Sequence, residues 1–202
     1  MNEPIFLRDI RSVAEAAAQR VRRLATGRKA TVIAVGGAAG SGKTSLLAAT
    51  AANAPDDLNV AVIMASLADH EDAERLAARS LPTVSVDVPR PGALDAAMVE
   101  QALDALGDAA PDVVLIERPG SLTPPPPLGE QVNVMVVSAA GGQRLPVNYA
   151  PAFAACDAVV VNMIDLMALT EFRLNAFERH VRNVHPRADV LPLSCRTGEG
   201  LD

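Results

Sequence analysis

Aromatic side chains are scarce in this chain of 202 residues, which has four Phe, one Tyr and no Trp. Half of the residues are nevertheless hydrophobic, so Ala, Val and Leu must fill the core of one domain of ordinary size. No apolar run approaches the roughly 20 residues that a membrane-spanning helix needs. The first residues, Met1-Asn2-Glu3-Pro4, lack the basic and apolar regions of a secretory signal. We therefore expect a cytoplasmic protein with no membrane partner.

Cysteine and positive charge are also in short supply. The two cysteines, Cys156 and Cys195, lie far apart and provide no disulfide framework. The net charge of −6 and the pI near 5.1 argue against a nucleic acid or an anionic membrane as the main partner. Among the 18 basic residues only Lys29 and Lys43 are lysines.

One of these lysines stands in a segment that matches the phosphate-binding pattern G-x-x-x-x-G-K-[ST] at every fixed position, Gly37 to Thr44. The segment follows an apolar run, 31–35, and opens a helix-like one, 45–49, which is the context that a nucleotide cradle requires. Glycines let backbone N–H groups face phosphate oxygens, and the helix N-terminus adds positive charge. A compact ammonium fits such a loop better than a planar guanidinium.

We therefore predict that this segment binds a nucleoside triphosphate. Lys43 is expected to neutralise the β- and γ-phosphates, and the Thr44 hydroxyl to bind Mg²⁺. The predicted phosphate-binding residues are Gly37, Gly40, Ser41, Gly42, Lys43, Thr44 and Ser45.

The rest of the chain alternates short β-rich runs with helical patterns, which predicts an α/β fold with a doubly wound, mostly parallel sheet of about seven strands. Runs that are apolar on both faces, such as 132–137, are typical of strands covered by helices on both sides. Strands are expected over 30–36, 59–64, 83–88, 112–117, 131–138, 157–162 and 189–193. Helices are expected over 5–26, 44–53, 70–80, 93–107 and 171–184.

The first of these helices is amphipathic. We expect residues 1–28 to pack as a helix on a nucleotide-binding domain of residues 29–202. The four prolines at 124–127 must be extended. We interpret them as a stiff loop, with a ligand for an SH3-type domain as the alternative.

Ligands of open α/β sheets lie beyond the carboxyl ends of the strands. After the fourth predicted strand stands Glu117-Arg118-Pro119-Gly120. Glu117 is placed to hold a Mg²⁺-bound water, and the Gly120 N–H to contact a γ-phosphate. The alternative is a plain acidic turn.

Two further loops follow the sixth and seventh predicted strands. Asn162-Met163-Ile164-Asp165 differs from the guanine-binding pattern N-K-x-D only in Met163. The carboxylate of that pattern accepts two N–H groups that adenine lacks, and a Met can replace much of the lysine stem. We expect guanine specificity with weakened GTP affinity, and expect Ser194 and Cys195 to line the base pocket. The alternative is a polar turn.

With these loops in hand, the chain resembles the nickel-incorporation GTPases of [NiFe]-hydrogenase maturation, which are relatives of the urease accessory GTPases. The resemblance implies GTP and Mg²⁺ as cofactors, a GTP-dependent homodimer, and a client metalloenzyme or a metal-carrying accessory protein as partner. It rests on the segments 40–44, 72–75, 94–96, 116–120, 146–157, 162–166 and 197–200.

The chain departs from this family where the family binds metal. Gly92 and Ala93 stand in place of a Cys-His pair, and Pro124 stands near the place of another Cys. Nickel and zinc need thiolate or imidazole donors, so we predict no nickel or zinc ligands in this chain. His180 and His185 are five residues apart on a predicted helix and cannot chelate together. Cys156 is expected to be a small core residue.

A third departure concerns hydrolysis. The family has Gly-Asp after the second strand, where this chain has Ala65-Ser66. Phosphoryl transfer depends on charge and positioning at that point, and Asp69 is the candidate replacement. Turnover is expected to be slower by on the order of 10²–10⁴-fold if the missing residue is a general base.

Two functions follow from these observations. The first is an accessory GTPase of metalloenzyme assembly whose partner holds the metal. The alternative is a catalytically weakened paralogue that acts as a nucleotide-dependent scaffold or regulator. A small-molecule kinase would need an acceptor base and an Arg-rich lid, and the sequence shows no such cluster.

Overall fold

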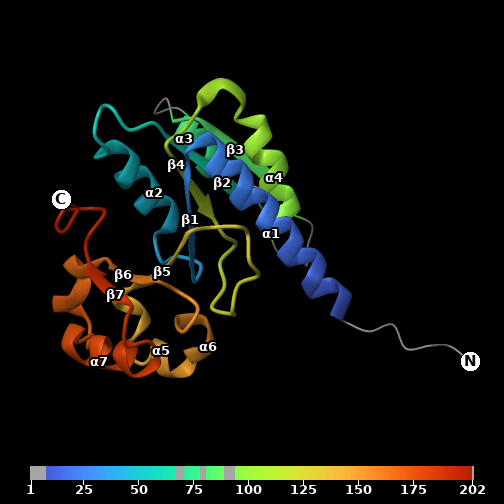
Figure 1. Cartoon of the computed structure of the whole chain (residues 1–202). Coiled ribbons are helices and arrows are strands. Elements are labelled where there is room, and N and C mark those ends of the chain that lie inside the picture. The colour runs from blue at the N-terminus through green and yellow to red at the C-terminus, as the bar shows by residue number, and fades with distance from the viewer. Residues whose placement is uncertain (1–7, 67–70, 78–80, 89–93, 202) are drawn as a thin grey trace, which may run out of the picture.

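The computed structural model describes residues 8–66, 71–77, 81–88 and 94–201, in which seven parallel strands form one sheet (Figure 1). The strand order is β3-β2-β4-β1-β5-β6-β7, so β1 lies at the centre of the sheet. The strand bounds are β1 Thr31–Gly37, β2 Val60–Ser66, β3 Thr83–Asp87, β4 Val113–Glu117, β5 Val132–Ser138, β6 Ala158–Asn162 and β7 Asp189–Pro192. The prediction of a doubly wound sheet of about seven strands is confirmed.

The helices connect successive strands and cover both faces of the sheet. Their bounds are α1 Arg8–Arg28, α2 Lys43–Ala52, α3 Glu71–Ala77, α4 Ala96–Ala105, α5 Leu145–Asn148, α6 Ala150–Phe153 and α7 Leu174–Val184, with 3₁₀ helices η1 Gly107–Ala109, η2 Ala139–Gly141 and η3 Ile164–Leu169. All five predicted helices are present within a few residues of their expected bounds. The short elements α5, α6, η1, η2 and η3 were not predicted.

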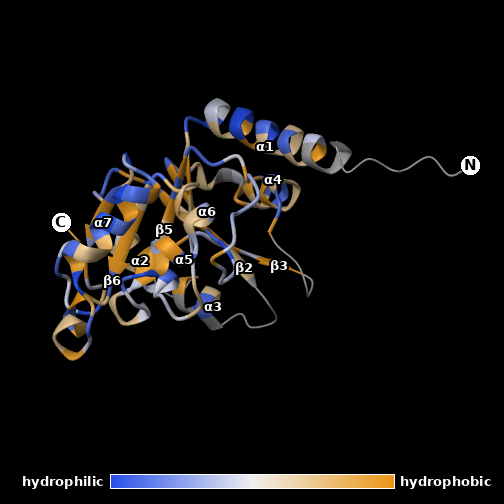
Figure 2. Cartoon of the chain, turned by 90° about the horizontal axis from the view of Figure 1, so that it is seen from below, coloured by the Kyte–Doolittle hydropathy of each residue, from blue (hydrophilic) through white to orange (hydrophobic). Residues whose placement is uncertain are grey.

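Alternating side chains of the central strands fill two layers of core. On one face Val32 of β1 and Ile116 of β4 pack with buried residues of α1 and α4. On the other face Val35 of β1 and Leu115 of β4 pack with Leu47 of α2. Figure 2 shows hydrophobic strands inside the molecule and hydrophilic residues along the outer side of α1. Strands buried on both faces explain why their sequences are apolar without alternation.

Helix α1 packs beside α4 through small side chains. Ala18 and Val21 are fully buried, while ion pairs join Arg20 to Glu100 and Arg28 to Asp104 at the rim of the contact. The exposed charges of these pairs contribute little stability, so the buried apolar stripe holds α1 in place. The expected division of the chain after residue 28 stays a prediction.

The loop between β4 and β5 contains the four prolines and is anchored by a buried ion pair. Arg118 Nη2 lies 2.6 Å from Glu130 Oε1, with only 7% and 13% of the two side chains exposed. Arg118 also donates to the Pro126 carbonyl at 2.8 Å. Burial lowers the pKa of Arg118, and the Glu130 charge opposes this shift. The pair therefore fixes the proline segment as part of the fold, beside the end of β4.

In the parts of the chain that the structure describes, no helix combines the length and the apolar character that crossing a membrane would require.

Candidate nucleotide-binding site

The turn from β1 to α2 has a backbone that only glycine adopts easily. Gly40 and Gly42 have φ values of 74° and 87°. A Cβ on Gly42 would overlap the Asn162 amide nitrogen, and one on Gly37 would overlap the Val136 carbonyl. Glycine is therefore required at this turn by conformation and by space. Gly42 provides no side-chain cap for α2, so the first N–H groups of this helix remain for an anion.

Two buried polar side chains of this loop are poised for a ligand. Ser41 is 2% exposed, and its Oγ has no hydrogen-bond partner among the described residues. Lys43 is 7% exposed, and its Nζ lies 3.2 Å from the Ala38 carbonyl oxygen and 3.4 Å from that of Gly37. Burial lowers the pKa of Lys43, while the charges of Glu117 and Asp72 oppose the shift. A bound phosphate would give this enclosed ammonium a counter-charge.

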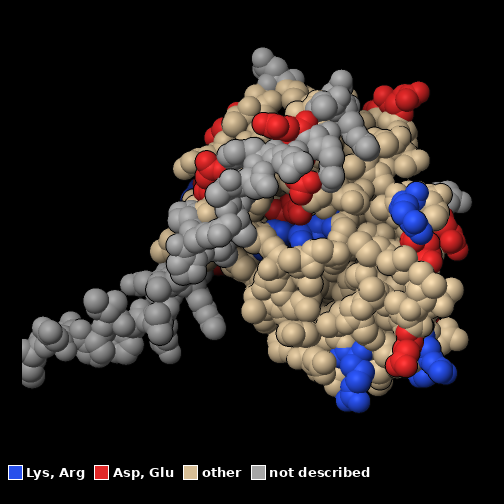
Figure 3. All heavy atoms as spheres, turned by 180° about the vertical axis from the view of Figure 1, so that it is seen from behind, with Lys and Arg blue, Asp and Glu red and all other residues tan. Residues whose placement is uncertain are grey.

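Oxygen donors from three elements meet at the start of α2. Thr44 Oγ1 lies 3.1 Å from Glu117 Oε1, at the end of β4, and 3.3 Å from Asp72 Oδ2, in the first turn of α3. A hydroxyl and two carboxylates are the hard donors that Mg²⁺ prefers, so the residues present fit this ion. Charges of both signs gather in a hollow near the middle of one face (Figure 3). Asp72 was not expected from the sequence to take part in metal binding.

The segment that follows β4 lies directly against the phosphate loop. The Ser121 N–H donates to the Gly37 carbonyl at 3.0 Å. A Cβ on Gly120 would lie only 2.9 Å from the Ala39 nitrogen, so a side chain there would push the two segments apart. The structure thus brings Glu117 and Gly120 to the loop, as the sequence led us to expect.

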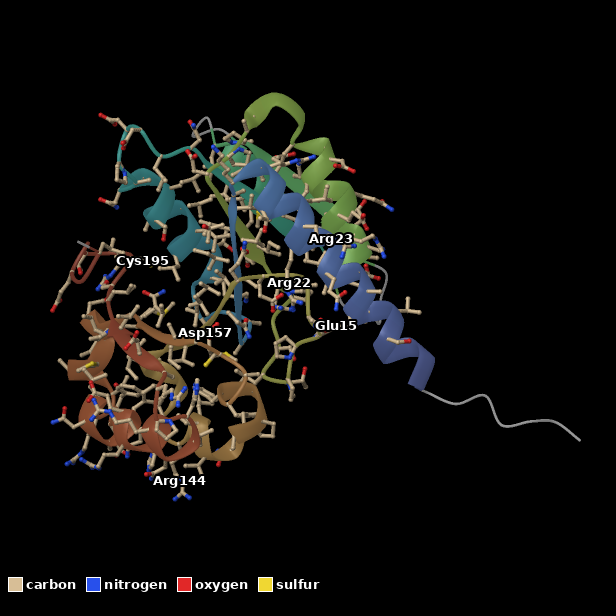
Figure 4. The ribbon with its side chains drawn as sticks, viewed as in Figure 1. Glu15, Arg22, Arg23, Arg144, Asp157 and Cys195 are labelled. Atoms are coloured by element: carbon tan, nitrogen blue, oxygen red, sulfur yellow. The ribbon has the colours of Figure 1, made fainter. Side chains whose placement is uncertain are left out.

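A second pocket of about 480 Å³ lies beside the start of α2. Figure 4 shows Cys195 on the C-terminal segment near α2. Burial raises the pKa of the Cys195 thiol. The residues that line the pocket are Ser45, Asn162, Met163, Asp165, Leu166, Cys195 and Arg196.

Asn162 joins this pocket to the phosphate loop. Its side chain is buried and donates to the Ser41 carbonyl at 3.2 Å. Its Oδ1 accepts the N–H groups of Met163, at 2.7 Å, and of Cys195, at 3.2 Å. Asn162 therefore holds three loops together, which is a positioning role in addition to the ligand contact we expected.

Both carboxylate oxygens of Asp165 accept hydrogen bonds within the protein. Buried Ser194 donates its hydroxyl to Oδ1 at 2.5 Å. Arg196 donates to Oδ2 through Nε at 3.0 Å and through Nη2 at 2.5 Å. These bonds lower the pKa of Asp165, with the Ser194 bond as the largest cause and Arg196 next among the groups that lower it. Arg196 was not predicted from the sequence, because no local pattern pairs positions 165 and 196.

Met163, which stands where the guanine-binding pattern has Lys, occupies a left-handed conformation with φ of 62°. Its sulfur accepts a hydrogen bond from the Ser138 hydroxyl at 3.2 Å. Left-handed backbone at a non-glycine residue is often found at functional sites. The side chain lines the pocket, and its expected contact with a purine face stays a prediction.

The remaining expected residues have different outcomes. Cys156 is 1% exposed in the core beside Phe153, and burial raises its pKa to about 11, so its prediction as a small core residue is confirmed. His180 Nδ1 lies 2.8 Å from the Gln143 carbonyl oxygen. The positions of Asp69, Gly92 and Ala93 lie outside the described residues, and their roles stay predictions. Among the described residues, no three His, Cys, Asp or Glu side chains gather in a metal-binding group.

Comparisons with known proteins agree with this geometry. Residues 31–192 match the family model of the CobW/HypB/UreG nucleotide-binding domain. The hydrogenase maturation factor HypB of Rhizobium leguminosarum bv. viciae is 33% identical over 165 residues, which are 81% of this chain and 55% of that protein. HypB of Escherichia coli K12 is 32% identical over 187 residues, which are 92% of this chain and 64% of that protein.

A solved structure is similar over a larger share of both chains. The crystal structure of HypB from Helicobacter pylori in complex with nickel has a TM-score of 0.88 and 25% identity, covering 93% of this chain and 89% of that one. Of the two HypB proteins from Rhizobium leguminosarum and Escherichia coli, by contrast, the chain spans only between half and two thirds of the length.

Proposed function

This chain belongs to the CobW/HypB/UreG family, and on that premise we propose that it is a magnesium-dependent GTPase that assists nickel insertion into a metalloenzyme. The observation that carries the proposal is the continuity of the site. Asn162 connects Ser41 of the phosphate loop to the loops that hold Asp165, so one nucleotide can occupy both ends. The names of the relatives, hydrogenase maturation factors, support the wider role.

At the phosphate end, we propose that backbone N–H groups and the Lys43 ammonium bind the nucleotide. Backbone N–H groups at the start of α2 hold the phosphates, and the Lys43 ammonium leaves the Ala38 carbonyl to contact their oxygens. Thr44, Glu117 and Asp72 would hold Mg²⁺, which supplies charge neutralisation when it is bound. The Gly120 N–H orients the terminal phosphate. With Ser66 in place of a carboxylate, turnover is expected to be slow.

At the base end, the proposed reader is Asp165. Its carboxylate accepts N1–H and the 2-amino group of guanine, which adenine does not offer. The Ser194 hydroxyl, bonded to Oδ1, holds the carboxylate in place. Met163 covers one face of the purine through its apolar side chain. This arrangement favours GTP over ATP through hydrogen bonds to a charged group.

In this proposal nickel is cargo and not a resident cofactor. Gly92, Ala93 and Pro124 carry no metal-binding side chain, so we propose that a client metalloenzyme or a metal-carrying accessory protein holds the ion. A GTP-dependent homodimer is part of the same proposal. GTP hydrolysis and the release of GDP would then determine when the chain binds and leaves that partner.

Turnover measurements test the enzymatic part of this proposal. We expect repeated GTP hydrolysis with Mg²⁺, reduced by about 10²–10³-fold in Lys43→Ala, because a donor to developing phosphate charge is lost. Lys29→Asn removes the other lysine, which is exposed and has φ of 57°, and should leave turnover unchanged. Tight GTP binding without turnover would instead favour the scaffold function.

A genetic measurement tests the role in nickel insertion. The full chain should restore hydrogenase activity and nickel content in a strain that lacks its own maturation factor, and Lys43→Ala should not. Equal restoration by wild type and Lys43→Ala would contradict a nucleotide-dependent role. Failure of both, with GTP turnover intact, would contradict the assignment to nickel insertion.

A further inference from the structure

The contacts of Asp165 leave too few acceptor positions for guanine. A carboxylate has about four lone-pair positions. Ser194 uses one on Oδ1, and Arg196 directs two N–H groups to Oδ2. Guanine needs two positions, for N1–H and for the 2-amino group, and only about one remains. One of the two protein partners must therefore move before the base can be read.

The two partners differ in how easily they can leave. Ser194 is fully buried, and its Oγ also accepts the Thr197 N–H at 3.2 Å, so this hydroxyl is fixed inside the loop. Arg196 is 73% exposed, while the Asp165 side chain is only 10% exposed. An exposed arginine exchanges its ion pair for water at small cost. Arg196 is therefore the partner that guanine displaces.

We propose that Arg196 is a competitive gate on the guanine-reading carboxylate, an inference that rests on the proposed function of the pocket as a guanine site. In the free protein, the guanidinium neutralises Asp165 and occupies the acceptor positions of Oδ2. Guanine compensates for the lost ion pair with two N–H donors, whereas a base without them leaves the pair in place. The gate lowers affinity for guanine nucleotides and slows their entry.

If Arg196 is such a gate, removing it should change nucleotide affinity in the direction opposite to that expected from charge alone. Removing a positive charge near a polyanionic ligand normally weakens binding. For a gate we expect the opposite: without Arg196, guanine nucleotides bind more tightly, because the base no longer has to break the Arg196–Asp165 ion pair. Arg196→Met retains an apolar side chain of similar length and removes the pair. Because an exposed ion pair contributes at most about 1 kcal/mol, its loss in Arg196→Met should raise the affinity for guanine nucleotides by about two- to fivefold.

The experiment compares GDP, IDP and ADP binding by titration calorimetry and stopped flow, in the presence of Mg²⁺. For Arg196→Met we expect a two- to fivefold gain in GDP affinity with faster association, a smaller gain for IDP, which lacks the 2-amino group, and none for ADP. The GDP gain should shrink as salt rises from about 20 to 500 mM, because salt screens the wild-type pair. Arg182→Met is the matched control, since Arg182 is 66% exposed and paired with Glu178 on α7.

The outcomes separate this inference from the proposed function. Unchanged or weaker GDP binding by Arg196→Met, with wild type still binding GDP, overturns the gate and leaves the guanine site intact. An equal gain for ADP also overturns it, because the effect would then not pass through the reading of the base. If wild type binds no guanine nucleotide, the proposed function itself fails. Circular dichroism of the exposed-site variants checks that their fold is retained.

Discussion

At the phosphate end of the proposed site, the groups proposed to hold a ligand belong mainly to the backbone, whereas at the base end they are side chains. The loop around Gly40 and Gly42 is shaped by left-handed glycines and by the contact with Asn162, and its donors are ready for an anion. Asp165 is instead engaged with Ser194 and Arg196. Apart from Lys43, which is bonded to the Ala38 carbonyl, the phosphate end offers backbone donors without an internal partner to displace among the described residues, whereas the base end must exchange an ion pair for its ligand.

This difference indicates how affinity and specificity are divided. In the proposed function, backbone donors and Lys43 hold phosphate in the same way for every nucleoside triphosphate, so they would provide affinity without choice of base. Asp165 is the residue proposed to distinguish bases, and its ion pair with Arg196 would reduce the net gain in free energy from the correct base. Substitutions at the phosphate end should therefore change the affinities for GTP and ATP alike, and substitutions at the base end should change the ratio of the two affinities.

The largest expected change in that ratio comes from Asp165→Ala. Loss of the equivalent of one charge-assisted hydrogen bond, at about 1.5–3 kcal/mol, should reduce the preference for GTP over ATP by between about tenfold and a hundredfold. Competition binding with both nucleotides measures the ratio. Asp189→Ala, at an exposed position at the start of β7, is the control. A ratio that survives the loss of Asp165 would place base recognition elsewhere.

The phosphate end should respond to Asp72→Asn through its metal. This change keeps the shape of the side chain near Thr44 but removes a charge from the proposed Mg²⁺ site. We expect the Mg²⁺ concentration for half-maximal GTP turnover to rise about tenfold, without a change in the GTP-to-ATP ratio. Glu74→Gln, an exposed position on the same helix, should have no effect. An unaltered magnesium dependence would remove Asp72 from the site.

A smaller gain is expected from Met163→Lys, which restores the residue of the guanine-binding pattern. The longer stem covers more of the purine, and its ammonium adds attraction to the aromatic face. We expect GDP affinity to rise by about two- to fivefold, as measured by calorimetry. Weaker binding would show that the bond between the Ser138 hydroxyl and the Met163 sulfur shapes the pocket more than coverage of the base does.

The smallest effect is expected from pH. The pKa of Asp165 lies below its ordinary value of 3.8 because of Ser194 and Arg196, so the carboxylate stays ionised as the pH falls from 8 to 5. Guanine recognition would be lost only at a pH near that lowered pKa. The terminal phosphate changes charge in both nucleotides alike. The GTP-to-ATP affinity ratio should therefore stay constant between pH 8 and 5, and a fall in this range would contradict an ionised reader.

Much of the fold could be predicted from local patterns. Buried parallel strands are continuous apolar runs, so all seven were located within a residue or two. The phosphate loop was recognisable because its glycines and Lys43 lie within eight consecutive residues. Short helices such as α5 and α6, of four residues each, have too few residues to show a helical period, although both carry Pro in the first turn, where it is favoured.

The remaining features of the site depend on pairs that are distant in sequence. Arg196 meets Asp165 only because β6 and β7 lie side by side. Asp72 reaches Thr44 because α3 begins next to the end of β4 in space, a placement that no local period encodes. The buried pair of Arg118 and Glu130 is closer in sequence, but the burial that makes it important depends on the packing of the whole loop.

Calorimetric titration of the wild-type chain with GTP and with ATP, both in the presence of Mg²⁺, tests the central claim most directly. The account predicts saturable uptake of GTP and clearly weaker uptake of ATP, with GTP uptake strongly reduced in Lys43→Ala. Absence of GTP uptake at millimolar concentration, or equal affinity for the two nucleotides, would contradict it.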